Sequence, residues 1–486
     1  MYSALLLLLT IVPIFVLGTL LVWVHKSGRK LWTVILGLTL FHELVLIVFP
    51  VWHSVFTDYS QERLMMASPK PIDLVVVMLG EAIFVTMFGI GFGIRRRRKM
   101  TVPVNRLIDK RLTRTDMLFL VTLTAFGMFI YLGDFISTPP SFQKYVAKVG
   151  GAFSTSFTGL IYAWSKAILW FPSLVACALV VTRFKNKRYP IWLSWMGAIT
   201  LISLLLTGVT SGLRGRITWA ISLLVISGYL KGQKRLIYAG LVFFVLLIPI
   251  FSILPGVVRS ISYSVAEHGG SRIDLSKKVF RKLKQSRNNK VDLIDFGSNF
   301  LADASWRAQG PRNSTVLYKL FDEGNIPGFT PYIGAILFPL PRAIWPGKPI
   351  IGSSDGTTPG VAMYTVMRIG HGLSYHVMGP CLASAHAYWE LGWAGILIYG
   401  LITGLFWNLI LTWCDKIGGP LSIVIALSFS ATLLIDGFLT MFAPLYSIIT
   451  SFWKVFIPVI VIYIVAYIMA GGWKKKRLFN SYHKKR

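Results

Sequence analysis

Long uncharged apolar runs dominate this sequence and constrain its fold more than any other feature. A transmembrane helix needs about 20 mostly apolar residues, and runs of this length recur along most of the chain. Only 14% of the residues are charged, whereas soluble domains carry about 25%. The chain is therefore expected to be a multi-pass membrane protein. The predicted spans are 3–24, 31–53, 74–94, 116–136, 158–182, 190–210, 217–230, 236–254, 388–413, 421–442 and 450–472.

These runs predict an all-α polytopic membrane protein with about eleven transmembrane helices. The first run has no A-x-A-like cleavage site and is too long for the apolar core of a signal peptide, so it is expected to remain as a span. The predicted organisation has eight spans in 1–254, a large loop in 255–387, three more spans in 388–472 and a basic tail in 473–486.

The distribution of basic residues predicts the orientation of the chain. It has 50 Lys and Arg against 19 Asp and Glu, a net charge of +31. Basic runs follow the first, third, fifth, seventh and last predicted spans, for example "IRRRRKM" after the third. Lys and Arg accumulate on short cytoplasmic loops, so these loops are expected inside and the N-terminus outside. This rule accounts for the positive charge, and nucleic acid is not an expected partner.

Cysteines and nucleotide motifs give no sign of a metal or a cofactor. Cys177, Cys381 and Cys414 are scattered and have no CxxC spacing, so neither a disulfide framework nor a metal site is expected. The sequence has no P-loop and no dinucleotide fingerprint. The energy for any chemistry is expected to come from the substrate or from an ion gradient.

The loop 255–387 is expected outside, although basic residues outnumber acidic ones in it. Leu275, Val279 and Leu283 recur at i+4 in "SRIDLSKKVFRKLKQSRNNK", which predicts an amphipathic helix on the bilayer surface; a solvated loop is the alternative. The later run "PGFTPYIGAILFPLP" is too short between its prolines to cross a membrane. A re-entrant or interfacial segment is expected there.

The stretch "FPLPRAIWPGKP" (338–349) closes this run and holds four prolines, which exclude a regular helix. It carries Arg342, Trp345 and Lys348. An arginine binds phosphate through two parallel hydrogen bonds, and a lysine supplies a mobile point charge. Tryptophan suits a sugar face or the lipid headgroup level. The strap 338–349 is therefore expected to line a cavity on the outer face.

A second basic motif, "TGVTSGLRGRI", lies between two predicted spans on the outer side. Gly212 and Gly215 flank Arg214 and allow the backbone to approach a ligand closely. Arg214 and Arg216 are expected to bind an anion, because the outer side does not otherwise favour positive charge. The alternative is that both side chains extend to lipid headgroups.

Ionisable residues inside spans are costly, and they mark functional sites by default. The alternative for each is internal pairing between spans. The candidates are His42, Glu43, Glu81, Asp134, Lys166, Glu390 and Asp436.

The stretches "TPYIGAIL", "LPRAIWPGKP" and "SAHAYWELGWAG" together resemble the bacterial O-antigen polymerases (Wzy-type oligosaccharide repeat-unit polymerases). In that family a Pro-Arg-x-x-Trp-Pro-x-Lys-Pro strap precedes a helix start that corresponds here to Tyr388, Leu391, Gly392 and Gly395. The glycine-flanked Arg214 is similar to an arginine on the family's outer side. This chain has Glu390-Leu391 where the family often has Asn-Phe.

The resemblance implies a GT-C-like glycosyltransferase that needs no metal or cofactor. Such an enzyme moves a growing glycan from undecaprenyl pyrophosphate onto a lipid-linked repeat unit, at the outer face of the bacterial cytoplasmic membrane. The expected partners are undecaprenyl-pyrophosphate-linked oligosaccharide, membrane lipids, a chain-length regulator and a flippase. An O-antigen ligase and a transporter or flippase of lipid-linked oligosaccharide remain as alternatives.

Glycosyl transfer from a pyrophosphate needs positive charge at the leaving group and a base for the acceptor hydroxyl. The residues expected to bind pyrophosphate are Arg214, Arg216, Arg342, Lys348 and Arg368. The candidates for the base are His376, Glu390, Asp355 and His371. Trp345 and Tyr388 are expected to contact sugar or lipid.

Overall fold

The computed structural model describes residues 2–49, 51–52, 71–94, 112–137, 157–182, 190–211, 214–235, 238, 242, 281, 310–324, 326–337, 381–432 and 441–471. These residues are helical or lie in short turns, and they contain no strand. The predicted all-α class is thus confirmed for the described part of the chain. The predicted helix around 271–290 lies outside the described residues except for Arg281, and so does the predicted span 236–254 except for two positions.

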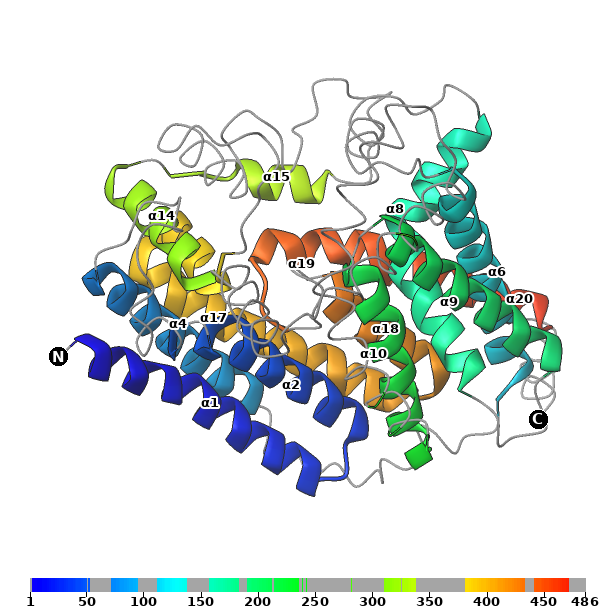
Figure 1. The fold of residues 1–486 in the computed structure, drawn as a ribbon, viewed down its shortest axis with the longest axis horizontal. Helices are drawn as coiled ribbons and strands as arrows, with labels where there is room; N and C mark the ends of the chain where they lie inside the picture. Colours follow the sequence, from blue (N-terminus) through cyan, green and yellow to red (C-terminus); the bar gives the residue numbers. More distant parts are fainter. Residues whose placement is uncertain are drawn as a thin grey trace, which may run out of the picture. The chain divides into compact units, whose positions relative to one another are not determined.

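The observed helices, labelled in Figure 1, overlap the predicted spans, except for Gly310–Asp322 and Thr330–Ile336, which lie in the predicted loop 255–387. They are α1 (Tyr2–Lys26), α2 (Lys30–Glu43) with the π-helical turn η1 (Leu44–Val48), α4 (Pro71–Gly93), α6 (Arg114–Ser137), α8 (Phe157–Val181), α9 (Ile191–Ser211), α10 (Arg214–Leu230), α14 (Gly310–Asp322), α15 (Thr330–Ile336), α17 (Ala383–Ile417), α18 (Gly419–Thr432), α19 (Leu445–Ser451), the π-helical turn η3 (Phe452–Phe456) and α20 (Ile457–Met469).

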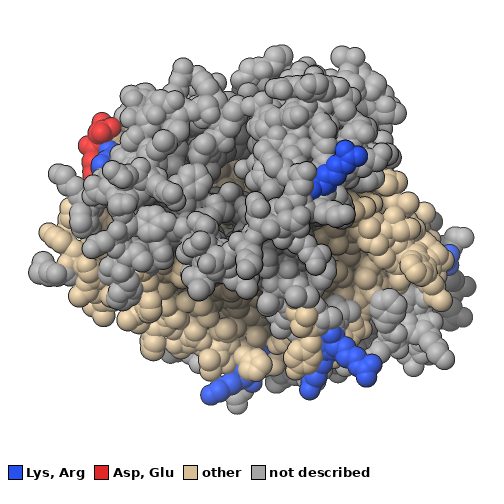
Figure 2. All heavy atoms as spheres, in the orientation of Figure 1, with Lys and Arg blue, Asp and Glu red and all other residues tan. Residues whose placement is uncertain are grey.

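Six helical segments of the described residues are long and apolar enough to cross a membrane. They are Tyr2–Lys26, Ile72–Gly93, Arg114–Gly133, Ile191–Gly208, Ala383–Ile417 and Leu445–Met469. This content is that of a membrane protein. In the view of Figure 2 the described surface is mostly uncharged, and its charged side chains lie in a few separate places.

The chain folds into two compact units. Unit 1 consists of 1–104, 301–416 and 429–453, and unit 2 of 105–300, 417–428 and 454–486. Each unit therefore combines segments that are far apart in sequence.

Unit 2 is built around the packed helices α6, α8 and α9. Helix α6 begins with a capping box, in which the backbone N–H of Thr113 donates to Asp116 Oδ2 (3.0 Å) and that of Asp116 donates to Thr113 Oγ1 (3.1 Å). Helix α20 packs on α6, with the rings of Phe119 and Tyr463 5.4 Å apart.

Unit 1 is held together by a close contact between α4 and α17. A Cβ added to Gly400 would lie 2.6 Å from the carbonyl oxygen of Phe84, and one added to Gly404 would lie 2.2 Å from that of Phe88. Small residues four apart let two membrane helices approach to backbone contact. Because both pairs advance by four residues, α4 and α17 run parallel.

Helix α2 runs antiparallel to α4 in the same unit. Its start lies at the C-terminal end of α4, where the rings of Trp32 and Phe92 are 5.2 Å apart. Its far end, η1, packs on α14. Helix α14 in turn packs on the N-terminal half of α4, where Lys319 Nζ of α14 lies 3.9 Å from Asp73 Oδ2 of α4. These directions agree with the alternation expected for consecutive spans.

Candidate functional site

Helix α17 is interrupted between Glu390 and Trp393. Leu391 has φ −140° and ψ 17°, and Gly392 has φ 61° and ψ −147°. The second combination is accessible essentially to glycine alone, and such strained positions cluster at functional sites. The interruption separates a first segment, 383–390, from the long remainder of the helix.

Gly395 lets the chain turn tightly at this point. A Cβ on Gly395 would lie 2.0 Å from the carbonyl oxygen of Ala387, closer than any side chain can approach. Gly392 is also closely packed, since its Cβ would lie 2.9 Å from Cζ of Phe321 in α14. The two glycines of the "GWAG" sequence thus make the interruption possible.

The interruption brings Glu390 to two tyrosine hydroxyls. Tyr399 donates a hydrogen bond to Glu390 Oε2 (2.6 Å), and Tyr332 from α15 donates to the same oxygen. In an uninterrupted helix Glu390 and Tyr399 would be separated by about 13 Å along the axis, beyond the reach of one tyrosine side chain.

The hydroxyls of Tyr332 and Tyr399 are 2.7 Å apart, so three oxygens lie within hydrogen-bond distance of one another. Two phenolic protons supply two of these three contacts, and a proton on Glu390 would supply the third. Burial and the bond to Glu390 raise the pKa of Tyr332 far above its ordinary value, so this hydroxyl keeps its proton and acts as a donor. The arrangement can therefore accept one proton at Glu390.

The other carboxylate oxygen of Glu390 is open to a further partner. The residue is 6% exposed, and its Oε1 has no hydrogen-bond partner among the described residues. A buried carboxylate oxygen without a partner is costly and calls for a ligand, a water or a proton. Glu390 therefore combines one carboxyl oxygen held by two tyrosines with a second oxygen that has no partner among the described residues.

Short helix α15 holds Tyr332 in place. It packs on α19, where the rings of Tyr332 and Tyr446 are 6.5 Å apart. Tyr446 also contacts His386 from the first segment of α17, with the two ring centres 6.4 Å apart. Tyr446 of α19 thus lies near both Tyr332 of α15 and His386 of α17.

Tyr388 lies in an aromatic cluster with residues of α14. Its ring stacks on Tyr318 at 3.9 Å between centroids, and its hydroxyl lies 3.4 Å from Asp322 Oδ1. The ring of Trp393 meets it edge to face at 5.4 Å. Tyr388 is buried, whereas Trp393 is 40% exposed, so Trp393 is the aromatic side chain of this cluster that reaches the surface.

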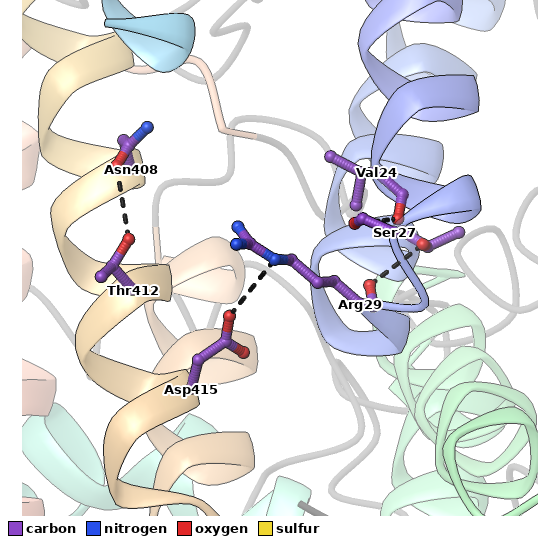
Figure 3. A network of polar contacts seen from close by, with 7 residues as sticks. Val24, Ser27, Arg29, Asn408, Thr412 and Asp415 are labelled. Atoms are coloured by element: carbon purple, nitrogen blue, oxygen red, sulfur yellow. Dashed lines mark hydrogen bonds and ion pairs between the residues drawn. The ribbon is translucent and has the colours of Figure 1, made fainter. Parts of the chain in front are cut away.

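A separate polar network joins the opposite end of α17 to the turn between α1 and α2 (Figure 3). Arg29 Nε lies 3.9 Å from Asp415 Oδ2, and the Arg29 guanidinium lies 4.5 Å from the centre of the Trp32 ring. Asn408 donates to the carbonyl oxygen of Phe92 and accepts from Thr412 Oγ1 at 3.3 Å. This network ties α1, α2 and α4 to the end of α17.

Replacing Arg29 with methionine is expected to destabilise unit 1, because it leaves Asp415 largely buried without its cation. The side chains are 17% and 9% exposed, so the expected cost is about 1–3 kcal/mol, between that of exposed and that of buried pairs. The double change Arg29→Met with Asp415→Leu should recover most of this loss. Denaturant unfolding measures both, with exposed Lys30→Met as the control, and an unchanged midpoint in Arg29→Met would exclude the stabilising role.

The structure describes only part of the predicted site. Glu390 and Tyr388 lie in the first segment of α17, and Arg214 and Arg216 form the first turn of α10 in unit 2. The predicted site residues outside the described part are Arg342, Trp345, Lys348, Asp355, Arg368, His371 and His376. Asp436 also lies outside it.

Sequence reasoning missed the tyrosines that hold Glu390. Tyr332 lies in the apolar run assigned as re-entrant or interfacial, and nothing local distinguishes it from a lipid-facing tyrosine. Tyr399 is nine residues from Glu390, a spacing that places no contact on a regular helix. The signal that was present is the pair Gly392 and Gly395 directly after an acidic residue.

No protein-family model matches this sequence, and comparison with the curated proteins and with the solved structures also finds no match. Within the described residues, no group of three or more His, Cys, Asp or Glu side chains is placed to hold a metal ion. The functional assignment therefore depends on the residues themselves.

Proposed function

We propose that this protein is a polysaccharide polymerase, a GT-C-like membrane glycosyltransferase with about eleven transmembrane helices. It would move a growing glycan from undecaprenyl pyrophosphate onto a lipid-linked repeat unit at the outer face of the bacterial cytoplasmic membrane. The observation that carries the proposal is the Glu390 carboxyl, held by two tyrosines at the interruption of α17. It follows directly after the loop with the proline strap 338–349.

In the proposed reaction Glu390 acts as the general base. The acceptor hydroxyl gives its proton to the carboxylate, its oxygen forms the new glycosidic bond, and the bond from sugar to pyrophosphate breaks. The pyrophosphate leaves with the bonding electrons, so no nucleotide or metal is required for energy. Asp355, His371 and His376 are the competing candidates for the base.

Positive side chains would stabilise the charge that develops on the departing pyrophosphate. Arg342, Lys348 and Arg368 supply it from the outer loop. Arg214 and Arg216 stand in the first turn of α10, where unpaired backbone N–H groups also favour an anion. Trp345 is assigned to sugar or lipid contact. Tyr388 was predicted for the same contact, but its ring is buried against Tyr318. A chain-length regulator and a flippase are the proposed protein partners.

The test is product analysis of purified protein supplied with lipid-pyrophosphate-linked repeat units. We expect a ladder of multiples, and we expect Arg342→Ala to abolish it, because the leaving group then lacks a bidentate cation. Removing one such electrostatic contact costs about 10²- to 10³-fold in rate. Lys319→Ala, which removes an exposed basic residue of the same predicted loop, is the control and should leave the ladder intact.

Two other outcomes would replace the proposal. Transfer to a lipid A core acceptor without a ladder would indicate an O-antigen ligase. A full ladder in Arg342→Ala would remove this arginine from the site.

A transporter of lipid-linked oligosaccharide is the second candidate. The observation that favours it is the interrupted helix α17 with buried carboxyls beside it, since transporters use discontinuous helices and intramembrane carboxyls. A purified protein that moves the lipid between leaflets and forms no glycosidic bond would establish this function instead.

A further inference from the structure

Helix geometry in unit 1 places Glu43 opposite Glu81. Trp32 in α2 contacts Phe92 in α4, and the two helices run antiparallel. Glu43 follows Trp32 by 11 residues, and Glu81 precedes Phe92 by 11 residues. Eleven residues correspond to about 16 Å and just over three turns, so both carboxyls stand at the same height and on the facing sides. Negative charges on Glu43 and Glu81 would therefore repel each other.

Glu43 is buried, and no described residue forms a hydrogen bond with its carboxyl group. It is 1% exposed, and neither of its carboxyl oxygens has a hydrogen-bond partner among the described residues. The adjacent His42 is the nearest titratable group on the same helix, with Nδ1 3.9 Å from Glu43 Oε1. Directly after Glu43 the helix changes to the π-helical turn η1, and such turns occur often at functional sites.

Glu81 is equally buried and is contacted from α17. It is 1% exposed, and Ser384 Oγ donates a hydrogen bond to its Oε2. Ser384 belongs to the same first segment of α17 as Glu390. No lysine or arginine within the described part of the chain forms an ion pair with Glu43 or Glu81.

A buried hydroxyl from α14 completes the surroundings. Tyr318 is 5% exposed, and its hydroxyl has no hydrogen-bond partner among the described residues. It is directed at α4 beside Glu81, because a Cβ on Gly80 would lie 2.0 Å from it. Burial raises the pKa of Tyr318 well above its ordinary value, so it remains a neutral donor. The ring of Tyr388 covers its other side.

Two facing carboxylates that no described lysine or arginine pairs with cannot both stay charged inside a membrane protein. Burial disfavours the charged form of each, and the second negative charge adds to this cost. Neutralisation by one proton removes the repulsion and supplies a hydrogen-bond donor. We propose that Glu43 and Glu81 form a proton-binding site that holds at least one proton in the resting protein at neutral pH.

The bound proton also affects the neighbouring site at Glu390. Ser384 connects Glu81 to the segment 383–390 that carries Glu390, so a change of protonation alters a contact that positions this segment. The proton is detected without any substrate, so its presence is independent of the proposed glycosyl transfer.

Infrared difference spectroscopy tests the proposal, because a protonated carboxyl absorbs at a frequency distinct from that of a carboxylate. The full-length protein is purified in a detergent without ester groups, whose carbonyls would overlap the signal. At neutral pH we expect the double variant Glu43→Gln with Glu81→Gln to lose the intensity of at least one carboxylic acid relative to the unmodified protein. The control is Asp73→Asn, which removes a partly exposed, lysine-paired carboxylate from the same helix α4 and should leave the acid band unchanged.

An acid band that is identical in the double variant and the unmodified protein would overturn the proposal, since both groups would then be carboxylates. If the double variant does not fold, Glu43→Asp and Glu81→Asp each retain an acid group and change its position. A band that shifts in either of these supports the proton site, and a band that shifts in neither excludes it.

Discussion

Replacing Glu390 with glutamine is expected to lower the rate of polymer formation by about 10²- to 10⁴-fold, the usual contribution of a general base. Glutamine keeps the shape of the side chain and an oxygen that accepts hydrogen bonds from Tyr332 and Tyr399. It cannot take the proton of an acceptor hydroxyl. The loss should therefore appear in the rate of the ladder assay while the amount of folded protein in the membrane stays unchanged.

The control for this experiment is Glu323→Gln, the same change of charge at an exposed position near the end of α14. It should leave the rate unaltered. Tyr399→Phe removes one of the two hydroxyls at Glu390 and is expected to have a smaller effect than Glu390→Gln, because Tyr332 still donates to the carboxyl. Undiminished polymer in Glu390→Gln would show that the base lies elsewhere, with Asp355, His371 and His376 as the remaining candidates.

Gly392→Ala is expected to cause a large loss of stability at the site. Alanine at φ 61° and ψ −147° is strained by about 1–3 kcal/mol. The new methyl group would also lie 2.9 Å from Cζ of Phe321, so the aromatic ring or the backbone has to move. Either shift separates Glu390 from Tyr399, and we expect the polymer ladder to disappear together with a lower unfolding midpoint.

Two further variants separate the causes of this loss. Phe321→Ala in the Gly392→Ala background removes the clash and leaves the backbone strain, so part of the stability should return. Gly18→Ala in α1 is the control, because a Cβ there has nothing within 4 Å and alanine favours helix by up to about 1 kcal/mol. A normal unfolding midpoint in Gly392→Ala would mean that the interruption of α17 does not require glycine.

The positions of the helices were largely predictable from sequence. Apolar length is a local property, and a membrane selects it directly, so the predicted ranges 3–24 and 74–94 agree closely with α1 and α4. The predicted range 388–413 describes α17 less well, because the helix begins earlier and is interrupted at Gly392. An average over an apolar window does not register a single residue with an unusual backbone angle.

The candidate site was predictable only through its acidic residues. Glu43, Glu81 and Glu390 were marked because charge inside a span is costly, and that cost depends on residue type alone. Their partners were not predictable. Tyr332 reaches Glu390 across 58 residues of sequence, and Ser384 reaches Glu81 across 303.

The helical class, the apolar runs of membrane length and the few acidic residues inside them follow from residue type and spacing along the chain. Tertiary structure alone decided which of these carboxyls meet hydroxyls and which face each other. The physical reason is the distance along the chain over which each effect acts. Hydropathy and glycine content act on neighbouring residues, whereas the pairing of Glu390 with Tyr332, or of Glu43 with Glu81, depends on the direction and register in which distant helices pack.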